Sequence, residues 1–217
     1  MLDFARMLAR GGPVMVPLLA CSLISLCVII ERLVVFQRAL GDTASLMEGI
    51  RRRYLHGDAA SALALCERSP GPVAAVLASG LREANVGGEG RVAQAMEEQA
   101  MAELPDLNRR LAVLDTIVTI APLLGLLGTV WGMINSFHVL ARTGVSRPTG
   151  ITAGIAEALI ATATGLVIAI VSLIAYNYFT DRVKQVTSEI EMRSTQFLNF
   201  LARSTEEKQV APQTARA

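Results

Sequence analysis

The sequence has few of the residues from which disulfide frameworks and metal centres are built. Only three of its 217 residues are cysteines and two are histidines. Cys21 and Cys27 are six positions apart in one apolar run, so on a helix their side chains point in different directions. No metal-ligand spacing connects Cys66 with His56 or His138. We therefore expect no disulfide, no metal and no other cofactor.

Charged residues are absent from three long stretches of a chain that is apolar overall. Hydrophobic residues make up 52% of the sequence and the mean hydropathy is +0.45, which is too apolar for an ordinary soluble domain. The uncharged runs cover residues 14–30, 116–141 and 158–180, and the last extends back through Glu157 to about residue 151. A helix crosses the hydrocarbon core of a bilayer with roughly 20 residues. We predict an all-α membrane protein with three transmembrane helices, at residues 14–36, 112–140 and 151–179.

The first apolar run has a second interpretation, as a cleaved leader. Arg6 and Arg10 precede it, and the letters LLAC at residues 18–21 match a lipoprotein cleavage site. A leader ends its apolar region near the cut, whereas this run continues well beyond Cys21. We therefore interpret the run as a span that stays in the protein.

Basic residues beside the spans predict the orientation of the chain. Arg32 lies near the inner end of the first span and Arg38 follows it, and Arg109 and Arg110 precede the second. Because such residues favour the cytoplasmic side, we expect the amino terminus to face outward and the long loop and carboxyl tail to face inward. The outer segments are then residues 1–13 and 141–150; the inner ones are a helical domain at 37–111, a helix at 180–203 and a disordered tail at 204–217. The net charge of +1 gives no indication of nucleic-acid binding.

The inner portion has the pattern of several helices. Asp58 predicts an N-cap, and residues 72–84 predict a short helix that ends at a glycine-rich segment. From residue 91 to residue 140 the pattern predicts one helix of about 75 Å, bent at Pro105 and Pro122. Its apolar face consists of Leu104, Leu107, Leu111, Leu114, Val118 and Ala121. Packing within the chain and contacts between subunits would both produce such a face.

Glu157 is an acid inside the third span, with no cation in the segment around it. It lies about 9 Å below the start of that helix. A charge near the bilayer centre costs at least about 2.5–3.5 kcal/mol, so the carboxyl group must face a cavity or the bundle interior, be protonated for part of the time, or have a partner. We interpret it as a proton-carrying site. A glutamate that only reaches the outer interface is the alternative.

Small and hydroxyl residues follow helical spacing in the second and third spans. We expect five glycines to let these helices approach closely: Gly125, Gly128, Gly132, Gly154 and Gly165. Thr129 and Thr162 stand on the same ridges of small residues. A threonine in a helix usually bonds back to a carbonyl of its own helix. Near an intramembrane acid, these hydroxyls also fit a hydrated proton path.

Asp115 stands near the inner end of the second span. Its expected role is an interfacial ion pair with a nearby cation, from Arg110, Arg182 or Lys184. A proton exit site is the alternative.

Two stretches of the chain resemble a known family. TIVTIAPLLGLLGTVWGMINSF at residues 116–137 and GITAGIAEALIATATGLVIAI at residues 150–170 are similar to spans of the ExbB/TolQ/MotA proton-channel proteins of bacterial inner membranes. The ER pair that ends the first span and a GD pair in the inner loop extend the likeness more weakly. Three spans with an outer amino terminus are closest to ExbB or TolQ, because MotA-type stators have four spans.

The resemblance implies a homopentameric ring in the inner membrane, with a periplasmic amino terminus and a cytoplasmic carboxyl terminus. Its pore would hold the single span of an ExbD/TolR-like partner, and a TonB/TolA-like protein would carry motion into the periplasm. Glu157 matches the family's third-span glutamate, and Thr129 and Thr162 match its pore threonines. Asp115 matches no family position with a role that we can assign. The implied function is the coupling of the proton motive force to mechanical work.

Three other classes of protein fit less well. An intramembrane protease needs a serine and a histidine on different spans, but Ser136 and His138 are two residues apart on one helix and point to different sides, so we expect no enzyme. A stand-alone ion transporter would be expected to contain internal repeats, which the sequence lacks. A membrane scaffold would not explain Glu157.

Overall fold

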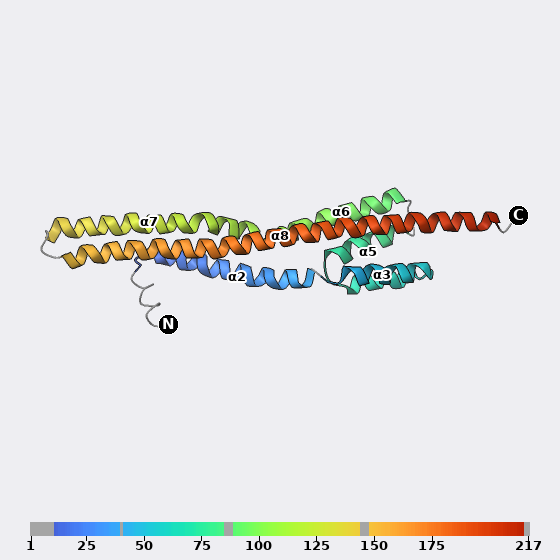
Figure 1. The fold of residues 1–217 in the computed structure, drawn as a ribbon, viewed down its shortest axis with the longest axis horizontal. Coiled ribbons are helices and arrows are strands. Elements are labelled where there is room, and N and C mark those ends of the chain that lie inside the picture. Colours follow the sequence, from blue (N-terminus) through green and yellow to red (C-terminus); the bar gives the residue numbers. More distant parts are fainter. Residues whose placement is uncertain (1–10, 40, 85–88, 144–147, 215–217) are drawn as a thin grey trace. The chain divides into compact units, whose positions relative to one another are not determined.

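The computed structural model describes residues 11–39, 41–84, 89–143 and 148–214, which form helices and turns without a strand. Three of these helices are long and apolar enough to cross a membrane: α2 (Met15–Ala39), α7 (Leu111–Thr143) and α8 (Pro148–Thr214) (Figure 1). The all-α fold and the three candidate membrane helices are therefore confirmed. The predicted outer segments 1–13 and 141–150 and the predicted tail 204–217 lie partly outside the described residues.

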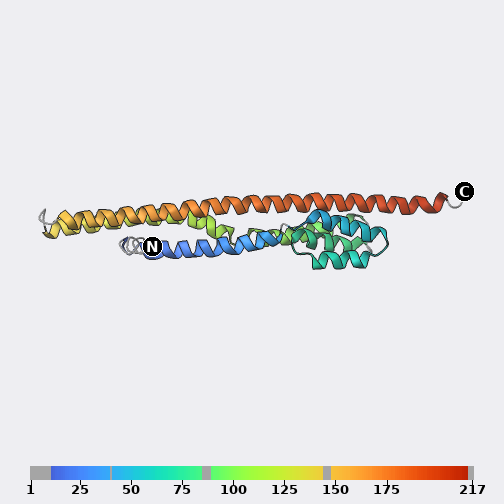
Figure 2. The same cartoon turned by 60° about the horizontal axis from the view of Figure 1, so that its bottom comes forward.

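The chain divides into two compact units. The first unit comprises Met1–Arg32 and Arg110–Phe179, and it contains most of α2, all of α7 and the amino-terminal part of α8. The second unit comprises Leu33–Arg109 and Thr180–Ala217. Both α2 and α8 contribute residues to each unit, and α8 runs without interruption (Figure 2). The uncharged runs of the sequence thus fall in the first unit and most of the charged helices in the second.

The core of the first unit joins all three membrane helices. Val14 lies just before α2, and Met15 and Leu18 are in its first turns; they are buried against Ala121 of α7 and Ala161 of α8. Ile117, Ile168 and Ala169 complete this cluster. The opposite face of α7 stays exposed in the single chain, with large apolar side chains at Leu123, Leu126, Leu127, Val130, Ile134 and Phe137. A lipid bilayer or neighbouring subunits can cover that face.

The long helix expected at residues 91–140 is two helices, so this expectation is wrong. α6 (Glu89–Asn108) ends before α7 begins at Leu111, and Arg110 between them has a left-handed φ of 62°. The Asn108 side chain donates to the Leu104 carbonyl at 3.0 Å at the end of α6, and the Val113 N–H donates to the Arg110 carbonyl at 3.1 Å at the start of α7. Pro105 and Pro122 lie inside the two helices and do not end them.

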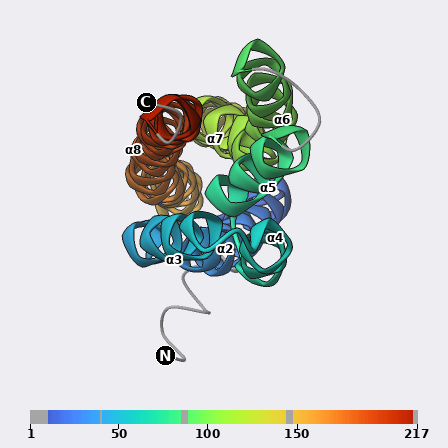
Figure 3. The same ribbon diagram turned by 90° about the vertical axis from the view of Figure 1, so that its right-hand side faces the viewer.

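Four short helices of the second unit follow one another in close contact. α3 (Thr43–Leu55) packs on α4 (Ala59–Arg68), α4 on α5 (Pro72–Ala84), and α5 on α6 (Figure 3). The helix predicted at residues 72–84 is confirmed with both bounds. The N-cap predicted at Asp58 is also confirmed, because its carboxylate accepts a hydrogen bond from the Ser61 N–H at 2.9 Å. Asp42 caps α3 in the same way through Ser45.

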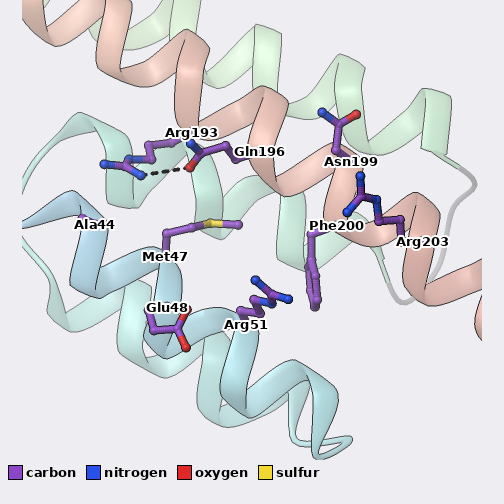
Figure 4. Close-up of a pocket in the computed structure, with 9 residues that line it drawn as sticks. All are labelled: Ala44, Met47, Glu48, Arg51, Arg193, Gln196, Asn199, Phe200 and Arg203. Atoms are coloured by element: carbon purple, nitrogen blue, oxygen red, sulfur yellow. Dashed lines mark hydrogen bonds between the residues drawn. The ribbon is translucent and has the colours of Figure 1, made fainter.

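The carboxyl-terminal part of α8 packs on α3 within the second unit. Thr43 donates its hydroxyl to Glu189, and the Arg51 guanidinium lies 5.9 Å from the centre of the Phe200 ring. Arg51 and Phe200 border a pocket of about 430 Å³, in which Arg193 donates to Gln196 at 2.9 Å (Figure 4). Arg193 thus bonds to Glu189 and Gln196 of its own helix, and Arg51 of α3 contacts α8 through the Phe200 ring.

The end of α8 differs from the sequence expectation. Residues from 204 onward are polar and were expected to be disordered, but the helix continues to Thr214. No proline breaks the pattern before Pro212, and glutamate, lysine and glutamine at 206–209 all have high helix propensity.

Candidate functional site

Glu157 lies on α8 in the first unit and is half-buried. Its carboxylate contacts the backbone of Gly12, in the turn that leads into α2: a side chain on residue 12 would overlap Oε1 of Glu157 and would lie 3.2 Å from Cγ. Gly12 has a φ of +71°, a conformation that glycine adopts more readily than other residues. The acid is therefore placed against protein backbone within the unit.

The five glycines lie where α7 and α8 approach each other. A Cβ on Gly132 would be 2.7 Å from the carbonyl oxygen of Gly154, and one on Gly154 would overlap the Ser136 hydroxyl. Further along, Gly128 faces the methyl group of Ala161. A Cβ on Gly165 would be 2.5 Å from the carbonyl oxygen of Ala121 and 3.2 Å from Cα of Gly125. At each of these contacts the neighbour is backbone or a small side chain, so any larger residue would separate the two helices.

Thr162 connects the two helices by a hydrogen bond. Its hydroxyl donates to the Gly125 carbonyl on α7 at 2.9 Å. Thr129 and Thr164 bond within their own helices instead, to the carbonyls of Leu126 at 2.6 Å and Ile160 at 2.8 Å. Of the two predicted pore threonines, Thr162 therefore holds the helix pair together and Thr129 keeps its hydroxyl on the α7 backbone.

Asp115 is exposed and, among the residues that the structure describes, forms no ion pair. The predicted partners bond elsewhere. Arg110 forms an ion pair with Glu31, Lys184 with Asp181 at 3.2 Å, and Arg182 donates to Gln185 at 2.9 Å. The ion pair expected between Asp115 and Arg110 is therefore not formed, because Arg110 pairs with Glu31 at the end of the first span.

A pair of buried serines was missed by the sequence analysis. Ser25 on α2 and Ser172 on α8 share a hydrogen bond of 2.7 Å and are buried. A serine in an apolar helix gives no sequence signal for such a pair, because it can equally bond to its own helix carbonyl. Gly12 was missed as well, since its significance depends on a contact with a residue distant in sequence. The described residues contain no group of His, Cys, Asp and Glu that could hold a metal ion.

Comparison with known proteins places these helices in a family. Residues 68–192, which include Glu157 and both threonines, match the model of the MotA/TolQ/ExbB proton channel family. The ExbB-like 3 biopolymer transport protein of Synechocystis sp. is 34% identical over 192 residues, which cover 84% of this chain and 90% of that protein. The chain belongs to the MotA/TolQ/ExbB proton channel family. The resemblance inferred from the second and third spans is thereby confirmed.

Relatives named ExbB and TolQ align over part of their length. The biopolymer transport protein ExbB of Pseudomonas putida is 39% identical over 113 residues, which cover 52% of this chain and 34% of that protein. The Tol-Pal system protein TolQ of Pseudomonas aeruginosa is 40% identical over 112 residues, which cover 52% of this chain and 48% of that protein. The chain is thus a membrane protein of a proton-channel family, and these two relatives match it over about a third to a half of their own length.

Proposed function

We propose that this MotA/TolQ/ExbB family protein is an inner-membrane proton-channel subunit that couples the proton motive force to mechanical work. The observation that carries the proposal is Glu157, an acid in an apolar membrane helix whose carboxylate lies against the backbone of Gly12 in the same unit. Such a group is costly in a bilayer, and a segment with only a structural role would avoid it. A proton that binds there neutralises the charge, and its release restores it.

The surroundings of Glu157 support a role in a rigid frame. Gly132 of α7 and Gly154 and Gly165 of α8 allow close contact between the two helices near Glu157, and Thr162 bonds across to the Gly125 carbonyl. A proton site needs such a frame, because the charge change must be converted into a force on a neighbouring group and not into local rearrangement. The transmembrane potential supplies about 2.3 kcal/mol per elementary charge per 100 mV, so a few protons suffice for a conformational step.

We infer that the moving part is supplied by other chains. In this proposal five copies form a ring, an ExbD/TolR-like protein places its single span in the pore, and a TonB/TolA-like protein transmits the motion to the periplasm. The amino terminus is periplasmic, the second unit is cytoplasmic, and the spans lie at residues 14–36, 112–140 and 151–179. The exposed apolar face of α7 supports contacts beyond the single chain, and the names ExbB and TolQ among the relatives support the choice of partners.

A stand-alone ion transporter and a membrane scaffold are the other candidate functions. A transporter would conduct protons without a partner, and a scaffold would work equally well without the acid. Two observations favour the channel subunit over both. Glu157 lies on α8, and residues 116–156 contain no second acid and no cation other than Arg142 and Arg147. A relay completed by another protein accounts for this.

The test is gradient-driven proton flux in vesicles that contain this protein with its co-purified partner, wild type against Glu157→Gln. Glutamine keeps the shape of glutamate and one of its accepting oxygens but cannot carry a proton. We expect the Glu157→Gln complex to assemble and to lose flux, whereas Asp115→Asn, the same change at the exposed acid of the same unit, keeps most of it. Normal flux in Glu157→Gln would overturn the proposal.

A further inference from the structure

The turn before α2 has an unusual backbone. Residues 11–14 precede the helix, Gly12 has a φ of +71°, and its carbonyl accepts a hydrogen bond from the Met15 N–H at 3.1 Å. Pro13 follows and fixes its own φ, so the chain direction at this point is largely set by two residues. An L-residue with a side chain adopts the conformation of Gly12 only with strain.

The carboxylate of Glu157 occupies the space beside Gly12 where a side chain would lie. Oε1 and Cδ of Glu157 lie within 3 Å of the point where a Cβ on residue 12 would be, and Cγ lies 3.2 Å from it. The carboxylate therefore rests on Cα of Gly12, a contact that weak Cα–H···O interactions favour. Gly11 does not share this environment, since a Cβ there would meet Met15 and, at 3.3 Å, Ile160.

The turn is held in place by the core of the first unit. Val14, Met15 and Leu18 are buried, and the Val14 side chain also lies 3.6 Å from the Cβ position of Gly128 on α7. Displacing Gly12 away from α8 would pull these residues out of the cluster they form with Ala121 and Ala161. A clash at residue 12 is thus relieved by rotation of the Glu157 side chain, which is the flexible member of the pair.

We propose that Gly12 is a positioning residue for proton transfer at Glu157: the turn before α2 closes one side of the carboxylate and fixes where it can exchange a proton. The inference rests on the proposed function of Glu157. Glycine is required at residue 12 for two separate reasons, its backbone conformation and the contact with the carboxylate. Proton exchange then proceeds from the side of the carboxylate that faces away from α2.

The first measurement compares proton flux in vesicles for wild type and Gly12→Ala, each with the co-purified partner and at equal assembly. A shift of about 1 Å in a reacting group can lower a rate by roughly 100-fold, so we expect Gly12→Ala to lower flux about tenfold or more. Gly57→Ala is the matched control for backbone strain, because Gly57 has a φ of +78° and has no atom within 4 Å of the new methyl group. We expect it to leave flux nearly unchanged.

The second measurement reports the carboxylate itself and does not depend on flux. Dicyclohexylcarbodiimide, an apolar reagent that attacks protonated carboxyl groups, is reacted with both proteins, and modification of Glu157 is followed by mass spectrometry. We expect the rate to change several-fold in Gly12→Ala and not in Gly57→Ala. If flux in Glu157→Gln is normal, the proposed function fails, but the labelling comparison still decides whether Gly12 positions the acid.

A shorter acid provides the rescue. Aspartate withdraws the carboxylate by about one bond length of 1.5 Å, so Glu157→Asp should lower flux by itself but raise it when Gly12 is already alanine. Higher flux, or restored assembly, in Gly12→Ala/Glu157→Asp than in Gly12→Ala supports the proposal. Labelling and flux changes no larger than those of Gly57→Ala, or additive losses in the double variant, overturn it.

Discussion

Hydroxyl side chains in the first unit bond in two different ways. Thr129 and Thr164 return to their own helix, whereas Thr162 bonds to the Gly125 carbonyl on α7, and Ser25 on α2 bonds to Ser172 on α8. Only the second kind holds one helix to another. In a bilayer, where no water competes, such bonds contribute to which helices pair and in which register.

The buried serine pair gives a prediction at the residue scale. We expect Ser25→Ala and Ser172→Ala each to lower the thermal stability of the purified protein, with a coupling energy of about 0.6 kcal/mol and at most about 1.7 kcal/mol. The double variant should be little less stable than either single one, because both remove the same 2.7 Å hydrogen bond. Fully additive losses in this double-mutant cycle would show that the two hydroxyls do not interact.

The carboxylates that cap two helices, Asp58 and Asp42, make the stability of the fold depend on pH. Hydrogen bonds from the Ser61 hydroxyl and N–H lower the pKa of Asp58 below its usual value of 3.8, and the Ser45 N–H does the same for Asp42. A carboxyl group whose pKa is lower in the folded state stabilises the fold above its unfolded pKa. This stabilisation is lost as the pH falls from about 3.8 through the folded pKa.

Asp58→Asn and Asp58→Ala separate the cap from its charge. Asparagine caps a helix well but does not titrate, and alanine neither caps nor titrates. At pH 7 we expect Asp58→Ala to melt at a lower temperature than Asp58→Asn, and both variants to lose less of their stability than wild type between pH 5 and pH 3. Thermal melts across this range test the assignment, and equal melting of the two variants at pH 7 would contradict it.

Caps and helices that depend on residues adjacent in the sequence could be predicted from the sequence. The cap at Asp58, the helix at residues 72–84 and the three apolar helices all follow from neighbouring residues. The break at Arg110 does not, because an arginine with positive φ has no sequence signature and its ion-pair partner Glu31 is distant in the sequence. The contact of Gly12 with Glu157 likewise joins residues far apart in the chain, so periodicity could indicate the acid but not its neighbour.

At the scale of the whole molecule, the apolar surface of the first unit exceeds what a single chain can cover. One face of α7 exposes Leu123, Leu126 and Phe137, and α8 exposes Leu159, Val167 and Ile174. Lipid can cover such faces without any oligomer, so exposure alone does not require a ring. The ring becomes necessary only if Glu157 acts on a partner that several copies must surround.

Native mass spectrometry of the protein from nanodiscs tests that requirement. We expect five copies of the 23.2 kDa chain, together with a smaller number of partner chains when both are produced together. Glu157→Gln should keep this stoichiometry, because the proposed role of the acid is proton transfer and not assembly. Leu126→Asn, which alters an exposed side chain of α7 and spares the Gly125–Thr162 contact, should dissociate the ring if that face joins subunits and leave it intact if lipid covers it. A monomer in every lipid composition would contradict the pentamer, and the proton path would then have to be completed within a single chain.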